Sequence, residues 1–492
     1  MSAEGQQTVR NAGLLIGQRG FHVAGALLVA ILIPRLMGPE IFGKYTLITS
    51  LSMWFALFNS LSSAQIMGRF VPQLAREENP ASLQKFLGNL FVVRLGNGVL
   101  AGAAYLLLTV LWFPELDRVA LAFIALTVLF RTSGKLVFAF FLGLNQAAHW
   151  GAGEILRQWL SLAGLLPGFY FGGLRGACLG IALAEFCVLL VGILLARSYL
   201  VWSHLRLDRR YLAPFLQFSI AFFASNLLLT VAQRSGELLV RLASGDYVQV
   251  GYYGVAYKAY FLAAQTIWQL TMAFSPLVTS LRVQGNDEAI GRWIERLLKA
   301  LAVSGVVASF GALLLGEALV VLVIGKNYQP VATNLLFLAP ALLAYALASA
   351  ARLLALTYDR PRFALEAAAI QVVGFAGFGF PLAARYGSAG ACLAMLLSVA
   401  AYAAYFIWRM RGVRWLSLKG WAMPILLGLL FLPLAWLRSS WQINSALFLL
   451  FLVAYVSLLF LTKVIKPDEI LSLKRALRSA PKSEPGAVAT GY

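Results

Sequence analysis

The sequence is short of charge, and of negative charge above all. Its 492 residues include 20 Asp and Glu against 40 Lys and Arg, and charged residues make up only 12%. A soluble protein of this length would carry about a quarter charged residues. Hydrophobic residues reach 60% and come in long blocks, each close to the length of roughly 20 residues that crosses a bilayer as a helix. The composition excludes an ordinary soluble enzyme and predicts an all-α polytopic membrane protein.

Cysteine and histidine are also scarce, three of each, and scattered along the chain. The cysteines lie in apolar segments, which argues against disulfides, and the histidines are too far apart to suggest a metal site or a catalytic dyad. No Gly-x-x-x-x-Gly-Lys-Ser/Thr loop occurs, so the chain holds no ATP-driven motor. We therefore expect no enzyme activity, no cofactor and no metal.

The apolar segments predict about 14 transmembrane helices. They lie at 13–34, 43–67, 86–112, 118–142, 152–171, 175–199, 214–241, 248–275, 293–316, 330–356, 362–384, 388–409, 421–438 and 443–463. The first twelve would form two six-helix lobes, followed by two C-terminal helices. The expected domains are residues 1–200 (spans 1–6), 201–412 (spans 7–12), 413–463 (spans 13 and 14) and a cytoplasmic tail at 464–492.

Two polar breaks in the apolar pattern resemble each other. Residues 36–45 read LMGPEIFGKY, residues 244–253 read SGDYVQVGYY, and each ends in Gly-x-Tyr. The second follows the first after roughly 208 residues, with apolar runs of similar length around both, a pattern typical of repeated transporter halves. We expect each break to form a tight outer turn of a helical hairpin.

The distribution of basic residues predicts the orientation. When the connections are sorted alternately from a cytoplasmic N-terminus, Lys and Arg gather in the inner set and are scattered in the outer set. This is the positive-inside pattern, which places both termini in the cytoplasm. The net charge of +20 then indicates contact with anionic lipids and not with nucleic acid. Residues 1–12 are polar, and no cleavable signal peptide is expected.

Basic residues inside the predicted spans are the main site candidates, because ionisable groups in hydrocarbon are costly and usually face a cavity. They are Arg19, Arg131, Lys135, Arg234 and Lys258. Arg131 and Lys135 are four residues apart, so they share a helix face, and two cations repel unless an anion compensates. The pair therefore predicts an anionic ligand such as phosphate.

Other charged residues allow two interpretations. Glu237 and Glu185 are candidates for a coupling-ion or proton site, or each is a buried acid paired with a nearby arginine. Arg234 and Glu237 would then neutralise each other. Arg157 lies near a predicted helix end, where snorkelling to the interface is the plainer explanation.

Two stretches resemble a known family. The opening segments NAGLLIGQRG, ILIPRLMGPEIFGKYTLITSLSMWF and SAQIMGRFVPQLA, together with VGYYGVAYKAY at 250–260, resemble the bacterial polysaccharide-biosynthesis flippases. These are the O-antigen and exopolysaccharide repeat-unit flippases of the multidrug/oligosaccharidyl-lipid/polysaccharide exporter superfamily. The resemblance in motifs is confined to these two hairpins, whereas the hydropathy agrees over nearly the whole chain.

The resemblance implies a function. It implies two lobes around a central cavity, opening alternately to either side of the bacterial inner membrane and moving an oligosaccharide linked through pyrophosphate to undecaprenol. It also implies a cationic cavity for the pyrophosphate, with Arg19 where the related lipid II flippase has a cavity arginine. Spans 13 and 14 resemble that relative's extra pair, and polymerases and glycosyltransferases of the same pathway are expected partners.

Two rival functions make different demands on the sequence. A multidrug or toxin cation antiporter of the same fold would need deep acids in its cavity, and the spans contain few. A membrane glycosyltransferase or polymerase would need a large extracytoplasmic loop with catalytic acids, and no predicted outer loop is long enough.

Overall fold

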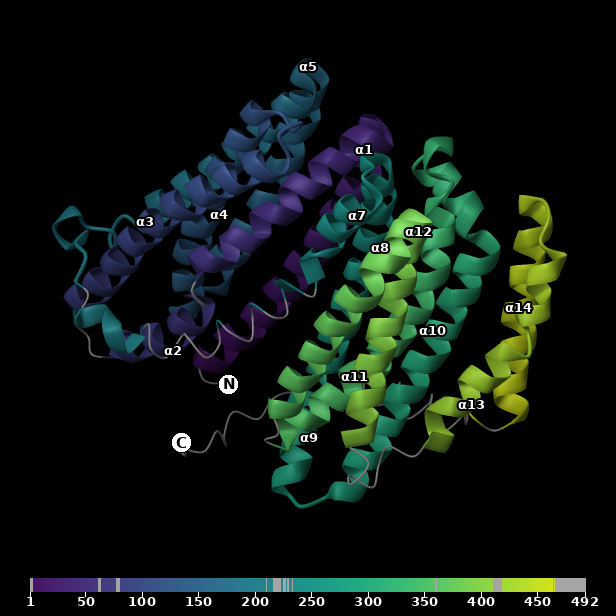
Figure 1. The fold of residues 1–492 in the computed structure, drawn as a ribbon. Helices are drawn as coiled ribbons and strands as arrows, with labels where there is room; N and C mark the ends of the chain where they lie inside the picture. Colours follow the sequence, from purple (N-terminus) through teal and green to yellow (C-terminus); the bar gives the residue numbers. More distant parts are fainter. Residues whose placement is uncertain are drawn as a thin grey trace. The chain divides into compact units, whose positions relative to one another are not determined.

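The computed structural model describes most of the chain as helices (Figure 1). The described residues are 3–60, 63–76, 80–208, 210–215, 223, 227, 230–231, 233–358, 361–409, 418–462 and 464. Within these ranges, the side chains of residues 3–20 and of several others, His22 and Val23 among them, lie outside the description. Helices are the regular elements throughout the described ranges, as the composition predicts.

The elements follow one another through short connections. They are α1 (Ala3–Ser60), α2 (Ser63–Arg76), α3 (Pro80–Trp112), α4 (Arg118–Gly143), α5 (Ala147–Leu195), η1 (Trp202–His204), α7 (Gly236–Ser244), α8 (Tyr247–Ala273), α9 (Ser275–Val283), α10 (Asp287–Val323), η2 (Lys326–Tyr328), α11 (Val331–Thr357), α12 (Pro361–Arg409), α13 (Leu418–Leu429), η3 (Leu432–Leu437) and α14 (Trp441–Leu461). Eight helices of the described part are long and apolar enough to cross a membrane. The number of 14 spans stays a prediction, and the predicted span 214–241 falls largely outside the described residues.

Three long helices contain a break at glycine. The φ angle is +70° at Gly38 in α1, +55° at Gly173 in α5 and +57° at Gly387 in α12. Glycine adopts this left-handed region without the steric cost that other residues meet. In α1 the break falls inside the predicted turn at 36–45, so the sequence located it correctly.

The break in α5 joins two helical halves that pack backbone to backbone. A Cβ atom on Gly168 would lie 2.2 Å from the carbonyl oxygen of Gly176, and one on Gly180 would lie 2.0 Å from that of Gly164. These contacts pair residues at equal distances from the turn at Gly172, which defines an antiparallel hairpin. Glycines four residues apart on each half allow this close approach.

The structure divides into two compact units. The first contains the residues up to Ile33 and Leu47–Arg234, and the second contains Pro34–Thr46 and the described residues from Ser235 onward. A short part of α1 therefore belongs to the second unit. The first unit has an apolar core that includes Phe86, Phe138 and Phe140, and the second has one that includes Ala351, Leu354 and Phe406.

Within the second unit, the two related breaks touch each other reciprocally. A Cβ atom on Gly43 would lie 1.8 Å from the carbonyl oxygen of Tyr247, and one on Gly251 would lie 2.1 Å from that of Pro39. Pro39 and Gly43 in the first break stand to each other as Tyr247 and Gly251 do in the second. The repeat found in the sequence is thus also a symmetric contact in space.

Helices α13 and α14 pack on α10 in the second unit. The rings of Phe310 in α10 and Phe451 in α14 stack with their centroids 4.1 Å apart. The Tyr455 hydroxyl donates to the carbonyl of Pro424 over 2.9 Å. This smaller cluster fixes the C-terminal helices to the unit without contributing to the charged groups described below.

Candidate functional site

A network of charged side chains joins α4 to both halves of the α5 hairpin in the first unit. Glu185, whose side chain is fully enclosed, accepts at Oε1 from Arg131 Nε over 2.7 Å and at Oε2 from Arg157 Nε over 3.1 Å. Arg157 also donates from Nη1 to Glu154 Oε1 over 2.6 Å. A buried carboxylate with two arginine partners keeps its charge, because the cost of desolvation is offset by charge-assisted hydrogen bonds.

The hairpin explains why these residues meet. Arg157 and Glu185 lie at nearly equal distances on either side of the turn at Gly172, so the glycine contacts that set the register bring them together. Arg131 approaches from α4, which packs along α5. The network therefore depends on a contact between the two halves of α5 as much as on the sequence of either half.

Lys135 lies one turn beyond Arg131 on α4 and differs from its neighbours. Its side chain is exposed, and within the described residues it has neither an ion pair nor a hydrogen bond. It lies within electrostatic reach of Arg131, Arg157, Glu154 and Glu185. Three cations against two carboxylates leave the group with one positive charge, and the accessible part of that charge is the Lys135 ammonium. Such a group can bind a phosphate oxygen.

A polar contact on the adjoining face of α4 stabilises the position of these groups. The Thr132 hydroxyl donates to the Val128 carbonyl over 2.7 Å and accepts a hydrogen bond from the Asn59 side chain. Asn59 is completely buried. Because buried polar groups without partners are costly, this pair ties α1 to α4 directly beside Arg131.

The second unit holds its charged residues differently. Glu237, in the first turn of α7, is almost fully buried. The Lys258 ammonium lies 4.4 Å from the ring centroid of Phe42 and 5.5 Å from that of Tyr45. The Arg241 guanidinium lies 4.2 Å from the ring of Tyr247. Aromatic faces attract cations, so these rings stabilise charge without neutralising it.

Two predicted site residues stand apart from both groups. Arg234 ends the first unit and is partly buried, and its carbonyl accepts from Trp54 Nε1 over 3.2 Å. Arg19 lies in the helical backbone of α1, but its side chain is outside the described part of the chain. The described residues also contain no group of three His, Cys, Asp or Glu placed to hold a metal ion.

With this geometry established, comparisons with known proteins place the chain. The model of a family described as "polysaccharide biosynthesis protein" matches residues 9–281, more than half of the sequence. The chain belongs to this family. The matched part spans the charged network, both related breaks and Lys258.

Solved structures share the fold of this family member. The lipid II flippase MurJ, in an inward closed conformation, aligns with a TM-score of 0.67 at 15% identity, covering 93% of this chain and all of its own. An inward-facing multidrug resistance transporter of the MATE family gives 0.63 at 15% identity, covering 81% and 96% of the two chains. A mutant of the Vibrio cholerae MATE transporter VcmN gives 0.51 at 14% identity, covering 83% and 98%. No curated protein sequence matches the chain.

These comparisons confirm an all-α, multi-pass membrane protein with a transporter fold. They leave the predicted site residues untested. The structure brings Arg131, Lys135 and Glu185 together in one unit, while Glu237 and Lys258 belong to the other. Glu185 is indeed a buried acid paired with arginine, and whether it also binds a coupling ion stays a prediction.

One sequence interpretation is wrong. Arg157 does not snorkel to the interface, because its side chain is only 9% exposed and pairs with both Glu154 and Glu185. The signal that identifies this pairing was present in the sequence. Glycines at 164, 168, 176 and 180 fix a hairpin register in which Arg157 faces the helical turn that carries Glu185.

Proposed function

We propose that the family member is a flippase, which moves an oligosaccharide linked through pyrophosphate to undecaprenol across the bacterial inner membrane. It would work by alternating access and change no covalent bond in its cargo. Membership of the polysaccharide biosynthesis family and a fold shared with a lipid II flippase support this. The observation that carries the proposal is the exposed, unpaired ammonium of Lys135 beside a net-positive buried network.

The network and Lys135 divide the work of binding an anion. Glu185 holds Arg131 and Arg157 in place, so their positions do not depend on a ligand. Lys135 then supplies a charge that a pyrophosphate oxygen can reach, and the remaining donors of the partly exposed Arg131 lie on the same helix face. The polyprenyl chain stays in lipid throughout, because only the head group carries a large desolvation cost.

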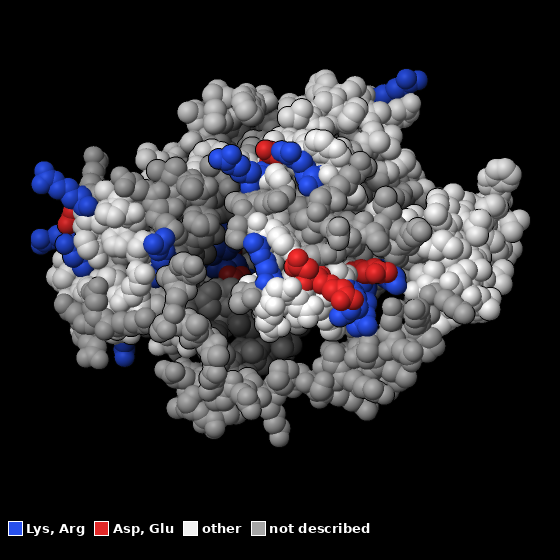
Figure 2. Space-filling model, turned by 90° about the horizontal axis from the view of Figure 1, so that it is seen from below, with Lys and Arg blue, Asp and Glu red and all other residues white. Residues whose placement is uncertain are grey.

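The remaining predicted residues take subsidiary roles. Arg19, Arg234 and Lys258 would offer further cationic contacts to the head group, and Glu237 or Glu185 would bind the coupling ion. Both termini would be cytoplasmic, with a pathway polymerase, glycosyltransferases and anionic lipids as partners. Lys and Arg side chains are more widespread than Asp and Glu on the described face seen from below α9 (Figure 2), which supports this orientation.

The experiment uses a strain that lacks the gene and accumulates undecaprenyl-linked oligosaccharide. Lys135→Gln should lower polymer export about tenfold, since one charge-assisted contact is lost, at an unchanged level of protein in the membrane. Lys135→Arg should restore most of it, and Lys326→Gln, an exposed lysine outside the network, should export normally. The double variant Arg131→Ala/Lys135→Ala should abolish export. Normal export by Lys135→Gln would rule out the assigned anion site.

A cation antiporter is the second candidate, favoured by the fold shared with MATE transporters and by the buried carboxylate of Glu237. In that case, expression of the chain should raise resistance to cationic drugs, and Glu237→Gln should abolish the gain. A flippase predicts no such gain, and Glu237→Gln would then affect polymer export alone.

A further inference from the structure

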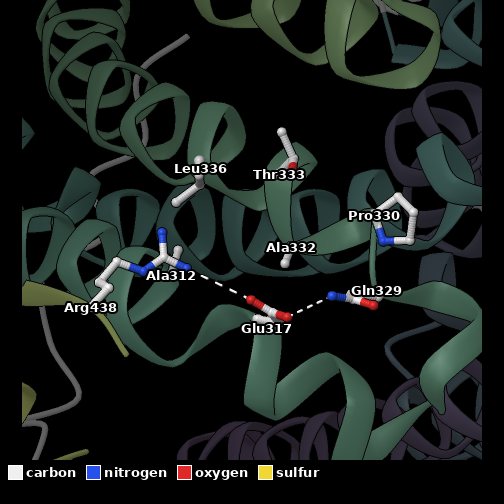
Figure 3. A pocket seen from close by; sticks show the side chains of 8 residues that line it. All are labelled: Ala312, Glu317, Gln329, Pro330, Ala332, Thr333, Leu336 and Arg438. Carbon is white, nitrogen blue, oxygen red and sulfur yellow. Dashed lines mark hydrogen bonds and ion pairs between the residues drawn. The ribbon is translucent and has the colours of Figure 1, made fainter. Parts of the chain in front are cut away.

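A polar pocket lies at one end of the second unit, away from the charged residues discussed so far. It has a volume of about 360 Å³ and is lined by Ala312, Glu317, Gln329, Pro330, Ala332, Thr333, Leu336 and Arg438. These residues come from three places in the chain: α10, the start of α11, and the connection between η3 and α14 (Figure 3). The pocket is therefore built by tertiary packing and not by a single loop.

The pocket contains one negative and one positive group that are only loosely joined. Glu317 Oε1 accepts from Gln329 Nε2 over 2.7 Å, whereas Glu317 Oε2 lies 4.0 Å from Arg438 Nη2 (Figure 3). A separation of 4.0 Å is too long for a hydrogen bond. Most donors of Arg438, and one carboxylate oxygen of Glu317, thus remain available to a ligand that carries both signs of charge.

The surroundings of the pocket indicate the depth at which it lies. Trp436 is 91% exposed, and Leu437 and Trp441 beside it are also largely exposed. Tryptophans next to exposed leucines are typical of the boundary between hydrocarbon and head groups. The contact between Glu317 and Arg438 also puts the α10–α11 and η3–α14 connections at the same end, and the sequence predicts that both are outer connections.

We propose that this pocket binds the head group of a zwitterionic aminophospholipid of the phosphatidylethanolamine type. The Arg438 guanidinium pairs with the phosphate, and the Thr333 hydroxyl donates to it. The primary ammonium donates to the Glu317 carboxylate and to the side-chain oxygen of Gln329. The acyl chains extend along the exposed leucines. The inference is independent of the cargo, because the pocket lies outside the anion site proposed for flipping.

The charges of the pocket determine its selectivity. An anionic head group such as phosphatidylglycerol would meet Arg438 favourably but place its negative charge beside Glu317. A choline head group has no N–H to donate, and quaternary ammonium is recognised by aromatic cages, whereas none of the residues that line the pocket is aromatic. A primary amine joined to a phosphate satisfies both groups at once.

Native mass spectrometry on the purified, delipidated full-length protein tests this. Titration with dioleoyl phosphatidylethanolamine should give one site that binds about tenfold tighter than dioleoyl phosphatidylglycerol does, the difference expected from one charge-assisted contact. Glu317→Gln should remove that preference, and Arg438→Gln should weaken both lipids. Glu317→Asp and Arg438→Lys, which keep the charges, should retain the preference if the Gln variants fold poorly.

Matched controls separate the pocket from general lipid binding. Glu295→Gln, on α10 and paired with Lys299, and the exposed Arg385→Gln should both behave as the wild type. Soluble O-phosphoethanolamine should compete only weakly, because it lacks the acyl chains. Equal binding of the two lipids to the wild type, or a preference that survives both Gln variants, would overturn the site. Soluble compound binding as tightly as the lipid would overturn the lipid as its source.

Discussion

The two units stabilise cations inside a membrane protein by different means. In the first, Arg131 and Arg157 pair with carboxylates, and Glu185 has no exposed side-chain surface. In the second, Lys258, Arg241 and Arg352 lie over aromatic rings at 4.2 to 4.4 Å. A carboxylate cancels the charge of its partner, whereas a ring attracts the cation and leaves its charge in place.

The difference shows that repeated halves need not share their chemistry. The breaks at 36–45 and 244–253 repeat closely and make reciprocal contacts, yet the charged residues around them do not repeat. The backbone symmetry belongs to the fold, and the side chains distinguish the units. The first unit should therefore depend strongly on its ion pairs and the second on its backbone and ring contacts.

The largest effect should come from the centre of the network. Glu185→Gln leaves Arg131 and Arg157 buried without a counter-charge and should destabilise the protein by about 4 kcal/mol, measured by thermal unfolding in detergent. Glu154→Gln, which has one arginine partner and is partly exposed, should cost about 1 kcal/mol. Equal losses for the two variants would contradict a network centred on Glu185.

A somewhat smaller effect is expected where the two breaks touch in the second unit. A methyl group at Gly251 would overlap the Pro39 carbonyl, so Gly251→Ala should destabilise by about 2.5 kcal/mol through overpacking. Gly377→Ala has no neighbour within 4 Å and should be neutral or stabilise by about 0.5 kcal/mol, because alanine favours a helix. If Gly251→Ala is as stable as Gly377→Ala in a thermal melt, the close contact does not exist.

Local patterns predicted the helices, the glycine turn in α1 and the shared face of Arg131 and Lys135, because each depends on neighbours in sequence. The pairing of Glu185 with Arg131 and Arg157 depends on helices that pack across the fold, which hydropathy does not determine. Aromatic partners such as Phe42 for Lys258 are no easier to find, since apolar spans contain many rings. A hairpin register taken from the glycines of α5 would have recovered part of the network.

An arginine over a ring offers a milder test of the second unit. Arg352→Met keeps the side-chain volume but removes the charge above Trp268, 4.3 Å from its centroid, and should cost about 1.5 kcal/mol. Arg385→Met, at an exposed site over Tyr386, should cost about 0.5 kcal/mol. Chemical denaturation of both variants measures the pair, and a loss at Arg352 as large as that of Glu185→Gln would remove the contrast between the units.

The smallest effect should come from an ion pair at the surface of the first unit. In the connection before α4, partial burial alone would raise the pKa of Asp117, but hydrogen bonds from Arg175 and from the N–H groups of Ala120 and Val119 lower that pKa below its ordinary value of 3.8. The stabilisation is therefore complete above pH 3.8 and is lost as the pH falls through the lowered value.

Asp117→Asn keeps an oxygen that can cap α4 and should cost only about 0.5 kcal/mol at pH 7. The difference between this variant and the wild type should disappear in strong acid. Unfolding measured at pH 7 and near pH 3 checks this, and a difference that grows on acidification would show that the charge of Asp117 is not the stabilising element.

The placement of Pro34–Thr46 within the second unit has a consequence for biosynthesis. This part of α1 leaves the ribosome long before its partners Tyr247, Gly251 and Tyr328, whose hydroxyl donates to the Pro34 carbonyl. The early hairpin must wait in the bilayer, with the close-packing face around Gly43 uncovered, until α8 has been inserted. The first unit therefore cannot be completed as a separate product ahead of the second, and assembly of the two is coupled during translation.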